Sequence, residues 1–187
     1  MVVRGAPIRA ADAADRDAAD RDAAVWAAIA EVPDPEIPTI SLVELGVVRG
    51  FAFGGGPGGE VRLTVELLPT FVGCPAVEVM REQVGDRLRE LGVADEVIVE
   101  LSFAEPWTSD RITPAGREAL RQGGFAPPPR TGSTFIGDDL LTVLPVTTCP
   151  YCASRNTTLE NPFGPTLCRA IYHCADCRQP FEAFKAV

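Results

Sequence analysis

Apolar residues at the spacing of an amphipathic helix mark the first patterned part of the chain. Val25, Trp26, Ile29 and Val32 fall along a helix over residues 23–32. The prolines that follow should end this helix, because proline cannot continue one. The preceding residues are mostly Ala, Asp and Arg and have no wide apolar stripe. We expect them to form a frayed or disordered head, or an extension of the first helix.

A strand, strand, helix, strand pattern follows. Residues 44–53 and 61–68 predict two paired strands, with the glycine-rich run 54–59 as the turn between them. Apolar positions at helical spacing predict a helix over residues 76–91, and residues 97–103 predict a third strand. Together with the first helix, these elements predict an α+β domain with its own core.

The C-terminal part of the chain predicts a further helix, a linker and a second, smaller domain. Thr113 is a candidate N-cap and Pro114 a suitable first-turn residue for the helix. Residues 123–133 are rich in Pro and Gly, which predicts a stiff, extended linker. A strand over residues 140–145 should lead into the second domain. We therefore divide the chain into residues 1–22, 23–122, 123–133 and 134–187.

Two C-x-x-C pairs form the most specific motif in the sequence. They are Cys149 with Cys152 and Cys174 with Cys177, and the intervening segment is long enough to form a hairpin. Two residues between paired cysteines let both sulfurs turn toward one ion, so the spacing predicts a tetrahedral site in a zinc ribbon. Two disulfides are the alternative. The N-terminus does not resemble a secretory signal, so we expect a reducing cytoplasm, where disulfides are disfavoured.

The identity of the metal and the exact ligand set stay open at this stage. Four thiolates suit a single iron ion, as in rubredoxin, as well as they suit zinc. His173 adjoins Cys174 and could replace one cysteine in a Cys3His site. Cys168 is a further soft ligand within the ribbon, but we interpret it as a structural residue.

Charge and composition exclude several classes of function. The net charge is −9, with 17 Lys and Arg against 26 Asp and Glu, which argues against nucleic-acid binding because that needs clustered cations. No apolar run approaches the roughly 20 residues that cross a bilayer, so we expect no membrane association. The sequence also contains no P-loop, dinucleotide fingerprint or di-iron motif. We therefore expect no catalytic residues.

Two short segments contain candidate ligands outside the ribbon. Asp34 and Glu36 lie in a proline-rich turn between the first helix and the first strand, where they could bind a metal, contact a cationic partner or simply cap the turn. Cys74 precedes a predicted helix, a position that should lower the pKa of its thiol and suit a metal or cluster. Thr70 could assist through its hydroxyl. A buried, inert Cys74 is the alternative.

Four segments together resemble the metal–sulfur cluster assembly domain: residues 34–38, 45–49, 70–75 and 106–113. That domain has the NifU-C-terminal-like α/β fold of iron–sulfur scaffold and targeting factors. With the ribbon and its insert over residues 161–170, the chain resembles the PaaD-like family. Members of this family are encoded with the phenylacetyl-CoA ring 1,2-epoxidase.

The resemblance implies an accessory role in aerobic phenylacetate degradation. It implies a non-catalytic factor that helps to mature the di-iron or iron–sulfur centres of the epoxidase, with transient iron or a cluster at Cys74. The expected partners are the oxygenase and reductase subunits or iron–sulfur assembly proteins, and a homodimer stays open. The alternative is a rubredoxin-like electron-transfer or structural subunit of the same complex. Zinc in the ribbon would exclude electron transfer, because zinc is not redox-active.

Overall fold

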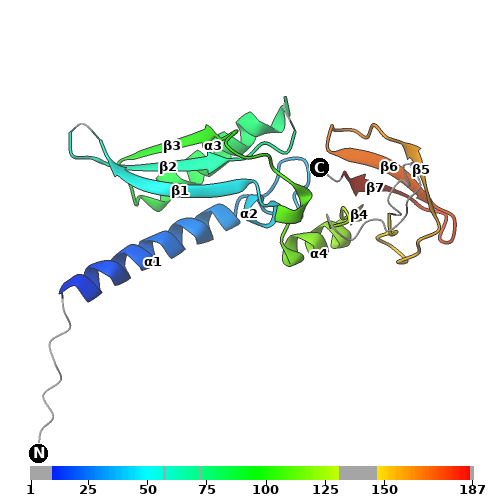
Figure 1. Cartoon of the computed structure of the whole chain (residues 1–187), viewed down its shortest axis with the longest axis horizontal. Coiled ribbons are helices and arrows are strands. Elements are labelled where there is room, and N and C mark those ends of the chain that lie inside the picture. Colours follow the sequence, from blue (N-terminus) through cyan, green and yellow to red (C-terminus); the bar gives the residue numbers. More distant parts are fainter. Residues whose placement is uncertain (1–9, 57, 72, 131–146, 186–187) are drawn as a thin grey trace, which may run out of the picture.

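Two separate sheets organise the chain (Figure 1). The structure is a computed structural model and describes residues 10–56, 58–71, 73–130 and 147–185. The first sheet has the strand order β1-β2-β3, and the second has the order β4-β7-β6-β5. The predicted α+β fold is confirmed.

Twelve elements are present in the described residues. The helices are α1 (Ala10–Ala30), α2 (Leu42–Leu45), α3 (Ala76–Leu91), α4 (Pro114–Gln122) and a 3-10 turn (Ser109–Arg111). The strands are β1 (Val48–Gly55), β2 (Val61–Leu67), β3 (Glu96–Leu101), β4 (Phe125–Ala126), β5 (Thr157–Asn161), β6 (Arg169–Cys174) and β7 (Pro180–Phe184).

One face of the first sheet is covered by α1 and α3, and the other face is polar. Strand β2 pairs antiparallel with β1 and parallel with β3, and α3 forms the crossover between β2 and β3. Leu63 and Val65 of β2 are fully buried against Val25 of α1 and Leu88 of α3. Intervening side chains such as that of Glu66 point the other way, as the two-residue period of a strand requires.

Helix α1 is longer than the predicted 23–32 segment. It begins at Ala10, within the alanine-rich head, and ends at Ala30. Alanine has the highest helix propensity, which favours this extension. Two contacts from the second half of α1 hold the helix on the sheet. The guanidinium carbon of Arg21 lies 3.7 Å from the centre of the Phe53 ring, and the rings of Trp26 and Phe51 are 5.4 Å apart.

The predicted strand over residues 44–53 was wrong at its beginning, because a short helix precedes it. Ser41 accepts a hydrogen bond from the Glu44 amide at 3.2 Å, and the Glu44 carboxylate accepts one from the Ser41 amide at 2.9 Å. This reciprocal capping box starts α2, and Gly46 ends it with a φ of 73°. The strands predicted over 61–68 and 97–103 and the helix over 76–91 are confirmed to within two residues.

Segments 45–49 and 106–113, far apart in the sequence, pack directly against each other. The Trp107 indole donates a hydrogen bond to the Leu45 carbonyl at 3.1 Å, and Arg111 donates one to the Gly46 carbonyl at 3.0 Å. A Cβ atom at Gly46 would lie only 2.4 Å from the Arg111 carbonyl oxygen. Only glycine satisfies both this close approach and the positive φ. Beyond these contacts, Thr113 caps α4, as predicted, by accepting from the Gly116 amide at 3.0 Å.

The second sheet is a ribbon to which the preceding segment adds one strand. Strands β5 and β6 form the antiparallel hairpin expected between the cysteine pairs, and β7 pairs with β6. Phe125–Ala126, within the segment expected to be a linker, form β4 and pair parallel with β7. The strand predicted over residues 140–145 lies outside the described residues. The division into four parts stays a prediction.

The ribbon packs against the first domain. The rings of Trp107 and Phe184 are 5.8 Å apart, and both side chains are almost fully buried. Cys168 and Phe184 of the ribbon belong to the same apolar cluster as the core of the first domain. This contact brings the loop before β6 close to the loop that contains Glu36.

Candidate functional site

Two matching turns bring the four ribbon cysteines together. In the first, the Cys149 carbonyl accepts from the Ala153 amide at 3.0 Å. In the second, the Cys174 carbonyl accepts from the Arg178 amide at 2.8 Å. Ala153 and Arg178 each follow the second cysteine of a pair and have φ values of 60° and 59°. The two turns therefore have the same backbone path and present both pairs of sulfurs to one point.

The sulfur distances suit one tetrahedral ion. The Sγ atoms of Cys149 and Cys177 are 3.7 Å apart, and those of Cys152 and Cys174 are 3.6 Å apart. Four ligands about 2.3 Å from one ion lie roughly 3.8 Å from one another, which matches this arrangement. Backbone amides of Cys177 and Asp176 stabilise the thiolate of Cys174 and lower its pKa to about 6. The arrangement can hold a metal ion, as the sequence predicts, and four thiolates fit zinc or iron.

Hydrogen bonds connect the two cysteine turns outside the sulfur cluster. Asp176 accepts from the Ser154 hydroxyl at 2.5 Å and from the Asn156 side-chain amide at 2.9 Å.

His173 is not a member of the cluster of four sulfurs. It precedes Cys174 on β6, so its side chain points to the opposite face of the strand. This placement favours the four-cysteine ligand set over the Cys3His alternative.

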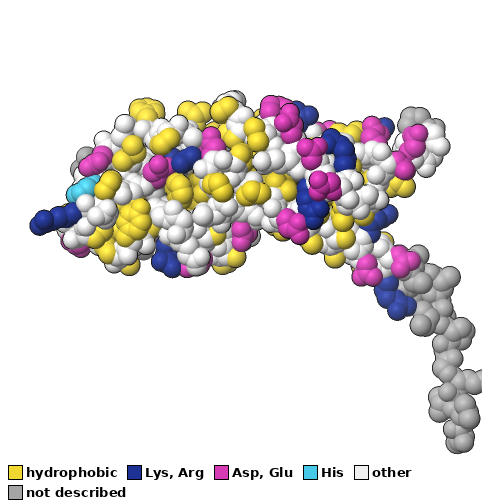
Figure 2. Space-filling view, turned by 180° about the vertical axis from the view of Figure 1, so that it is seen from behind, with side chains coloured by type: hydrophobic (Ala, Val, Ile, Leu, Met, Phe, Trp, Pro, Cys, Tyr) yellow, Lys and Arg dark blue, Asp and Glu magenta, His cyan; other side chains and the backbone are white. Residues whose placement is uncertain are grey.

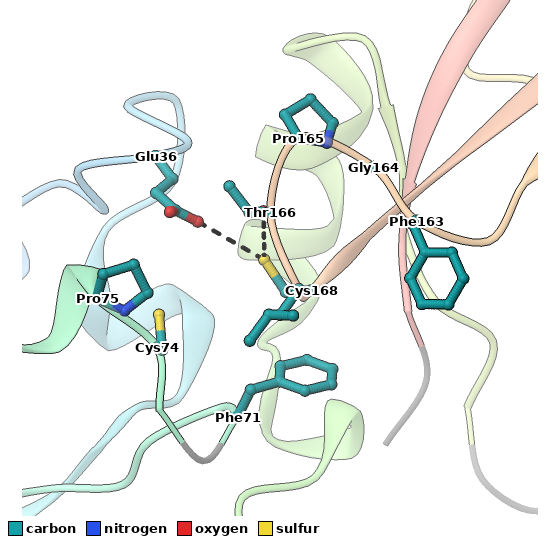
Figure 3. Close-up of a pocket in the computed structure, with 10 residues that line it drawn as sticks. Glu36, Phe71, Cys74, Pro75, Phe163, Gly164, Pro165, Thr166 and Cys168 are labelled. Atoms are coloured by element: carbon teal, nitrogen blue, oxygen red, sulfur yellow. Dashed lines mark hydrogen bonds between the residues drawn. The ribbon is translucent and has the colours of Figure 1, made fainter.

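A second candidate site is an apolar cavity of about 260 Å³ between the first domain and the ribbon. We call it the thiol cavity, because Cys74 and Cys168 both line it (Figure 3). Glu36 contributes the carboxylate in its wall. The remaining lining residues are Phe71, Pro75, Phe163, Gly164, Pro165, Thr166 and Leu167.

Cys74 lies at the turn that leads into α3, as predicted, but its thiol is not activated. Gly73, with a φ of 81°, turns the chain, and α3 begins at Ala76. Burial raises the pKa of the Cys74 thiol, and the nearby Glu36 carboxylate raises it further. The Ala76 amide opposes these effects only in part. The predicted lowering of the pKa was wrong, because desolvation outweighs the favourable position before the helix.

The two carboxylates of the proline-rich turn have different surroundings. Oδ1 of Asp34 accepts hydrogen bonds from the amides of Glu36 and Ile37, both at 2.8 Å, and the side chain is 5% exposed. Burial raises the pKa of Asp34. Glu36 lies on the cavity side of this turn and faces the thiols (Figure 3). Asp34 thus holds the turn that presents Glu36.

Thr70 lies outside the thiol cavity. It is 9% exposed and lines a neighbouring groove that also contains Phe103 and Trp107. The structure therefore brings together Cys74 and Glu36, with Asp34 behind them, and places Thr70 on the far side of Phe71, which borders both hollows.

Cys168 and Arg169 are site residues that the sequence alone did not identify. The Cys168 thiol lies 3.8 Å from Oε2 of Glu36, and burial raises its pKa. Arg169 donates to the Glu36 carbonyl at 3.2 Å and to the Glu182 carboxylate at 2.8 Å. The sequence marked Cys168 only as a further soft ligand in the ribbon, and both residues by their place in the 161–170 insert. Neither signal carries information about which residues face the other domain.

The surface has no concentrated positive charge on the face shown in Figure 2, where basic and acidic side chains are interspersed. Ion pairs such as Arg87 with Glu31 and Arg62 with Glu96 account for several of the cations.

In the described part of the chain, no helix is both long enough and apolar enough to cross a membrane.

Comparison with known proteins matches the two domains to separate family models and most of the chain to a curated relative. Residues 22–101 match the family model described as an iron-sulfur cluster assembly protein, and residues 138–185 match the PaaD zinc beta ribbon domain. A protein of Escherichia coli K12, named as one subunit of a "Putative 1,2-phenylacetyl-CoA epoxidase", is 38% identical over 164 residues. The match covers 87% of this chain and 92% of that protein.

Solved structures resemble the chain at lower overall similarity. A domain of unknown function from Bacillus anthracis is 22% identical and has a TM-score of 0.44, covering 55% of this chain and 92% of its own. A Mycobacterium tuberculosis protein is described as associated with Fe-S complex assembly and repair. It is 30% identical with a TM-score of 0.35, covering 67% of this chain and 95% of its own.

Proposed function

The chain belongs to the PaaD family of 1,2-phenylacetyl-CoA epoxidase subunits, and from this premise we propose that it is an accessory maturation factor. Its task would be to deliver iron or an iron–sulfur cluster to the other subunits of the epoxidase. The partners under this proposal are the oxygenase and reductase subunits, or the assembly proteins that supply them.

The observation that carries the proposal is the thiol cavity. Cys74 is a free thiol, half-buried beside an apolar hollow, and the Glu36 carboxylate lies opposite it. A soft thiolate next to a hard carboxylate can take up a metal centre and still release it. The raised pKa of Cys74 keeps the empty thiol protonated, which protects it until a metal displaces the proton.

Zinc in the ribbon has a structural role in this account. The four sulfurs form a closed tetrahedral set, and a closed set is typical of structural zinc. A module of this size buries too little apolar surface to fold alone, so the metal would supply much of its folding free energy. The free cysteines need a reducing compartment, and the proposal places the protein in the cytoplasm.

The experiment that tests this function measures the metal content of the partner. The epoxidase subunits are produced in cells with the wild-type chain, with the Cys74→Ala variant or without the chain, and their iron and acid-labile sulfide are quantified after purification. Val79→Ala is the matched control, because Val79 is an exposed residue of α3 outside the cavity. We expect low iron or cluster content and low activity without the chain or with Cys74→Ala, and normal values with the control.

A second measurement separates maturation from electron transfer. A fully metallated epoxidase should turn over in vitro without this chain. If the chain is required even then, the electron-transfer alternative holds. If metallation is normal in the Cys74→Ala cells, Cys74 is an inert structural residue and the proposal fails.

A further inference from the structure

Two thiols from different domains face the same hollow. Cys74 comes from the turn before α3 in the first domain, and Cys168 comes from the loop before β6 in the ribbon. Figure 3 shows both sulfur atoms and the carboxylate of Glu36 directed into the space between the domains. Neither thiol belongs to the group of four ribbon sulfurs.

The ribbon insert is built to hold Cys168 in this position. The Gly164 amide donates to the Arg169 carbonyl at 2.9 Å, and a Cβ atom at Gly164 would lie 2.9 Å from that residue's backbone. Arg169, which is 9% exposed, reaches across to the Glu36 carbonyl while its other groups bind Glu182 and Thr166. This buried arginine fixes the cysteine beside it relative to the opposite domain.

Cys168 packs in the apolar cluster, but its sulfur also faces polar groups and the cavity. Its sulfur lies 3.8 Å from Oε2 of Glu36 and 3.1 Å from the Thr166 hydroxyl, and it borders a hollow of about 260 Å³. A cysteine that only fills space would be surrounded by close-packed carbon on all sides, including the side of its sulfur. The loop instead directs a soft ligand at a carboxylate and at open volume.

The spacing of these groups argues for a cargo larger than one ion. Ligands of a single tetrahedral ion lie roughly 3.8 Å apart. Within the described residues, the ribbon cysteines are the only group of three or more such side chains whose ligand atoms all lie within 4.8 Å of one another. Glu36, Cys74 and Cys168 are therefore spread more widely, around a hollow that has room for a polynuclear centre.

We infer that Cys74 and Cys168 together bind an iron–sulfur cluster in transit, with Glu36 as a weaker third ligand, so that the ribbon completes the transfer site. This inference rests on the proposed maturation function and names its cargo. Binding replaces the two thiol protons, which pass to solvent, and release restores them as thiolates of the acceptor take over the irons. The oxidation state of the cluster does not change in this exchange. The oxygen ligand favours release, because clusters prefer thiolates.

The test is anaerobic reconstitution of the full chain. Protein that already holds one zinc in the ribbon is incubated with sulfide and a mixture of ferrous and ferric iron, and bound iron, sulfide and zinc are counted after desalting. The variants are Cys74→Ser, Cys168→Ser and Cys168→Ala, the last preserving an apolar side chain should serine disturb the buried loop. Thr158→Ala is the matched control, because it changes an exposed residue of β5 in the same ribbon that does not line the cavity.

The inference predicts one cluster per wild-type and Thr158→Ala chain. Each cysteine variant should lose on the order of tenfold or more in bound iron and sulfide while keeping its zinc. If the Cys168 variants bind the cluster normally and Cys74→Ser does not, the inference is wrong and the maturation function stands. If the wild type takes up no iron, or if Cys74→Ser binds as much iron and sulfide as the wild type, the inference and the maturation function both fail. Binding of one iron without sulfide would also overturn the cluster assignment.

Discussion

A single carboxylate oxygen organises the turn on which Glu36 lies. Oδ1 of Asp34 accepts two backbone hydrogen bonds at 2.8 Å in a site that is nearly closed to solvent. Burial raises the pKa of Asp34, so the site disfavours the charged form of this carboxyl. What it requires is an acceptor of the right shape for the two amides.

Replacing Asp34 should therefore separate shape from charge. Asp34→Ala leaves two amides without a partner and should lower the free energy of unfolding by about 1–2 kcal/mol. Asp34→Asn keeps an acceptor oxygen and should lose less than about 1 kcal/mol. Urea denaturation followed by circular dichroism measures both. Equal losses in the two variants would mean that the charge itself matters, and the assignment of Asp34 as a turn cap would be wrong.

At the scale of elements, two helices approach so closely that a glycine is required between them. A Cβ atom at Gly116 of α4 would lie 2.6 Å from the Glu44 carbonyl oxygen of α2, and backbone cannot move aside easily. Alanine usually stabilises a helix relative to glycine by up to about 1 kcal/mol. Here the clash should reverse that sign, and Gly116→Ala should lose about 1–3 kcal/mol of stability.

Gly85 of α3 supplies the matched control for that prediction. A Cβ atom there would meet only the flexible guanidinium end of Arg89, at 3.0 Å, which can move away. Gly85→Ala should leave the melting temperature unchanged or raise it. If Gly116→Ala melts as high as Gly85→Ala, the close packing of α2 on α4 does not exist in solution.

The ribbon is the element whose folding should depend on its metal. Cys174→Ser should release the ribbon metal and unfold most of the ribbon, because Cys149 and Cys174 lie in its small apolar cluster, which is too small to fold without a metal. His173→Gln is the control, because His173 adjoins the ligand Cys174 but lies outside the sulfur cluster. Metal analysis together with circular dichroism checks both variants. Full zinc retention by Cys174→Ser, or loss of zinc from His173→Gln, would contradict the four-cysteine assignment.

Elements with a strong local pattern could be predicted from the sequence, and those that depend on distant contacts could not. Helix α3 carries a regular apolar face and a glycine stop, and it forms as predicted. The four-sulfur cluster follows from spacing alone, because the ligands lie in two tight turns. Helix α2 was missed although its capping box is visible in the sequence, since its apolar residues also fit a strand. Strand β4 has only two residues and exists because β7 lies beside it.

The sequence could predict only those residues of the candidate site that lie in the first domain. Cys74 and Glu36 belong to recognisable segments of the first domain. Cys168 joins them through the packing of Arg169 and Phe184 against that domain, which is a tertiary contact without local periodicity. The lowered pKa expected for Cys74 failed for the same reason, because its burial depends on residues far away in the sequence.

At the scale of the whole molecule, the charge distribution favours protein partners over nucleic acids. The net charge is −9, and on the face shown in Figure 2 the cations are interspersed with acidic side chains. We expect no tight binding to DNA or RNA, because phosphate recognition needs clustered Lys and Arg. A gel-shift titration at low and moderate salt measures this. Salt-sensitive binding below micromolar concentration would contradict it.

The central claim is that Cys74 passes a metal centre to the epoxidase, and the most direct measurement is transfer itself. The chain is loaded with isotopically labelled iron, mixed anaerobically with metal-free epoxidase subunits and separated from them, and the label on each protein is counted. The account predicts that label from the wild-type chain moves to the epoxidase and restores its activity, faster than from an equal amount of free iron. Cys74→Ala should give no transfer above that free-iron rate. Label that stays on the wild-type chain, or that moves equally well with Cys74→Ala, would contradict the account.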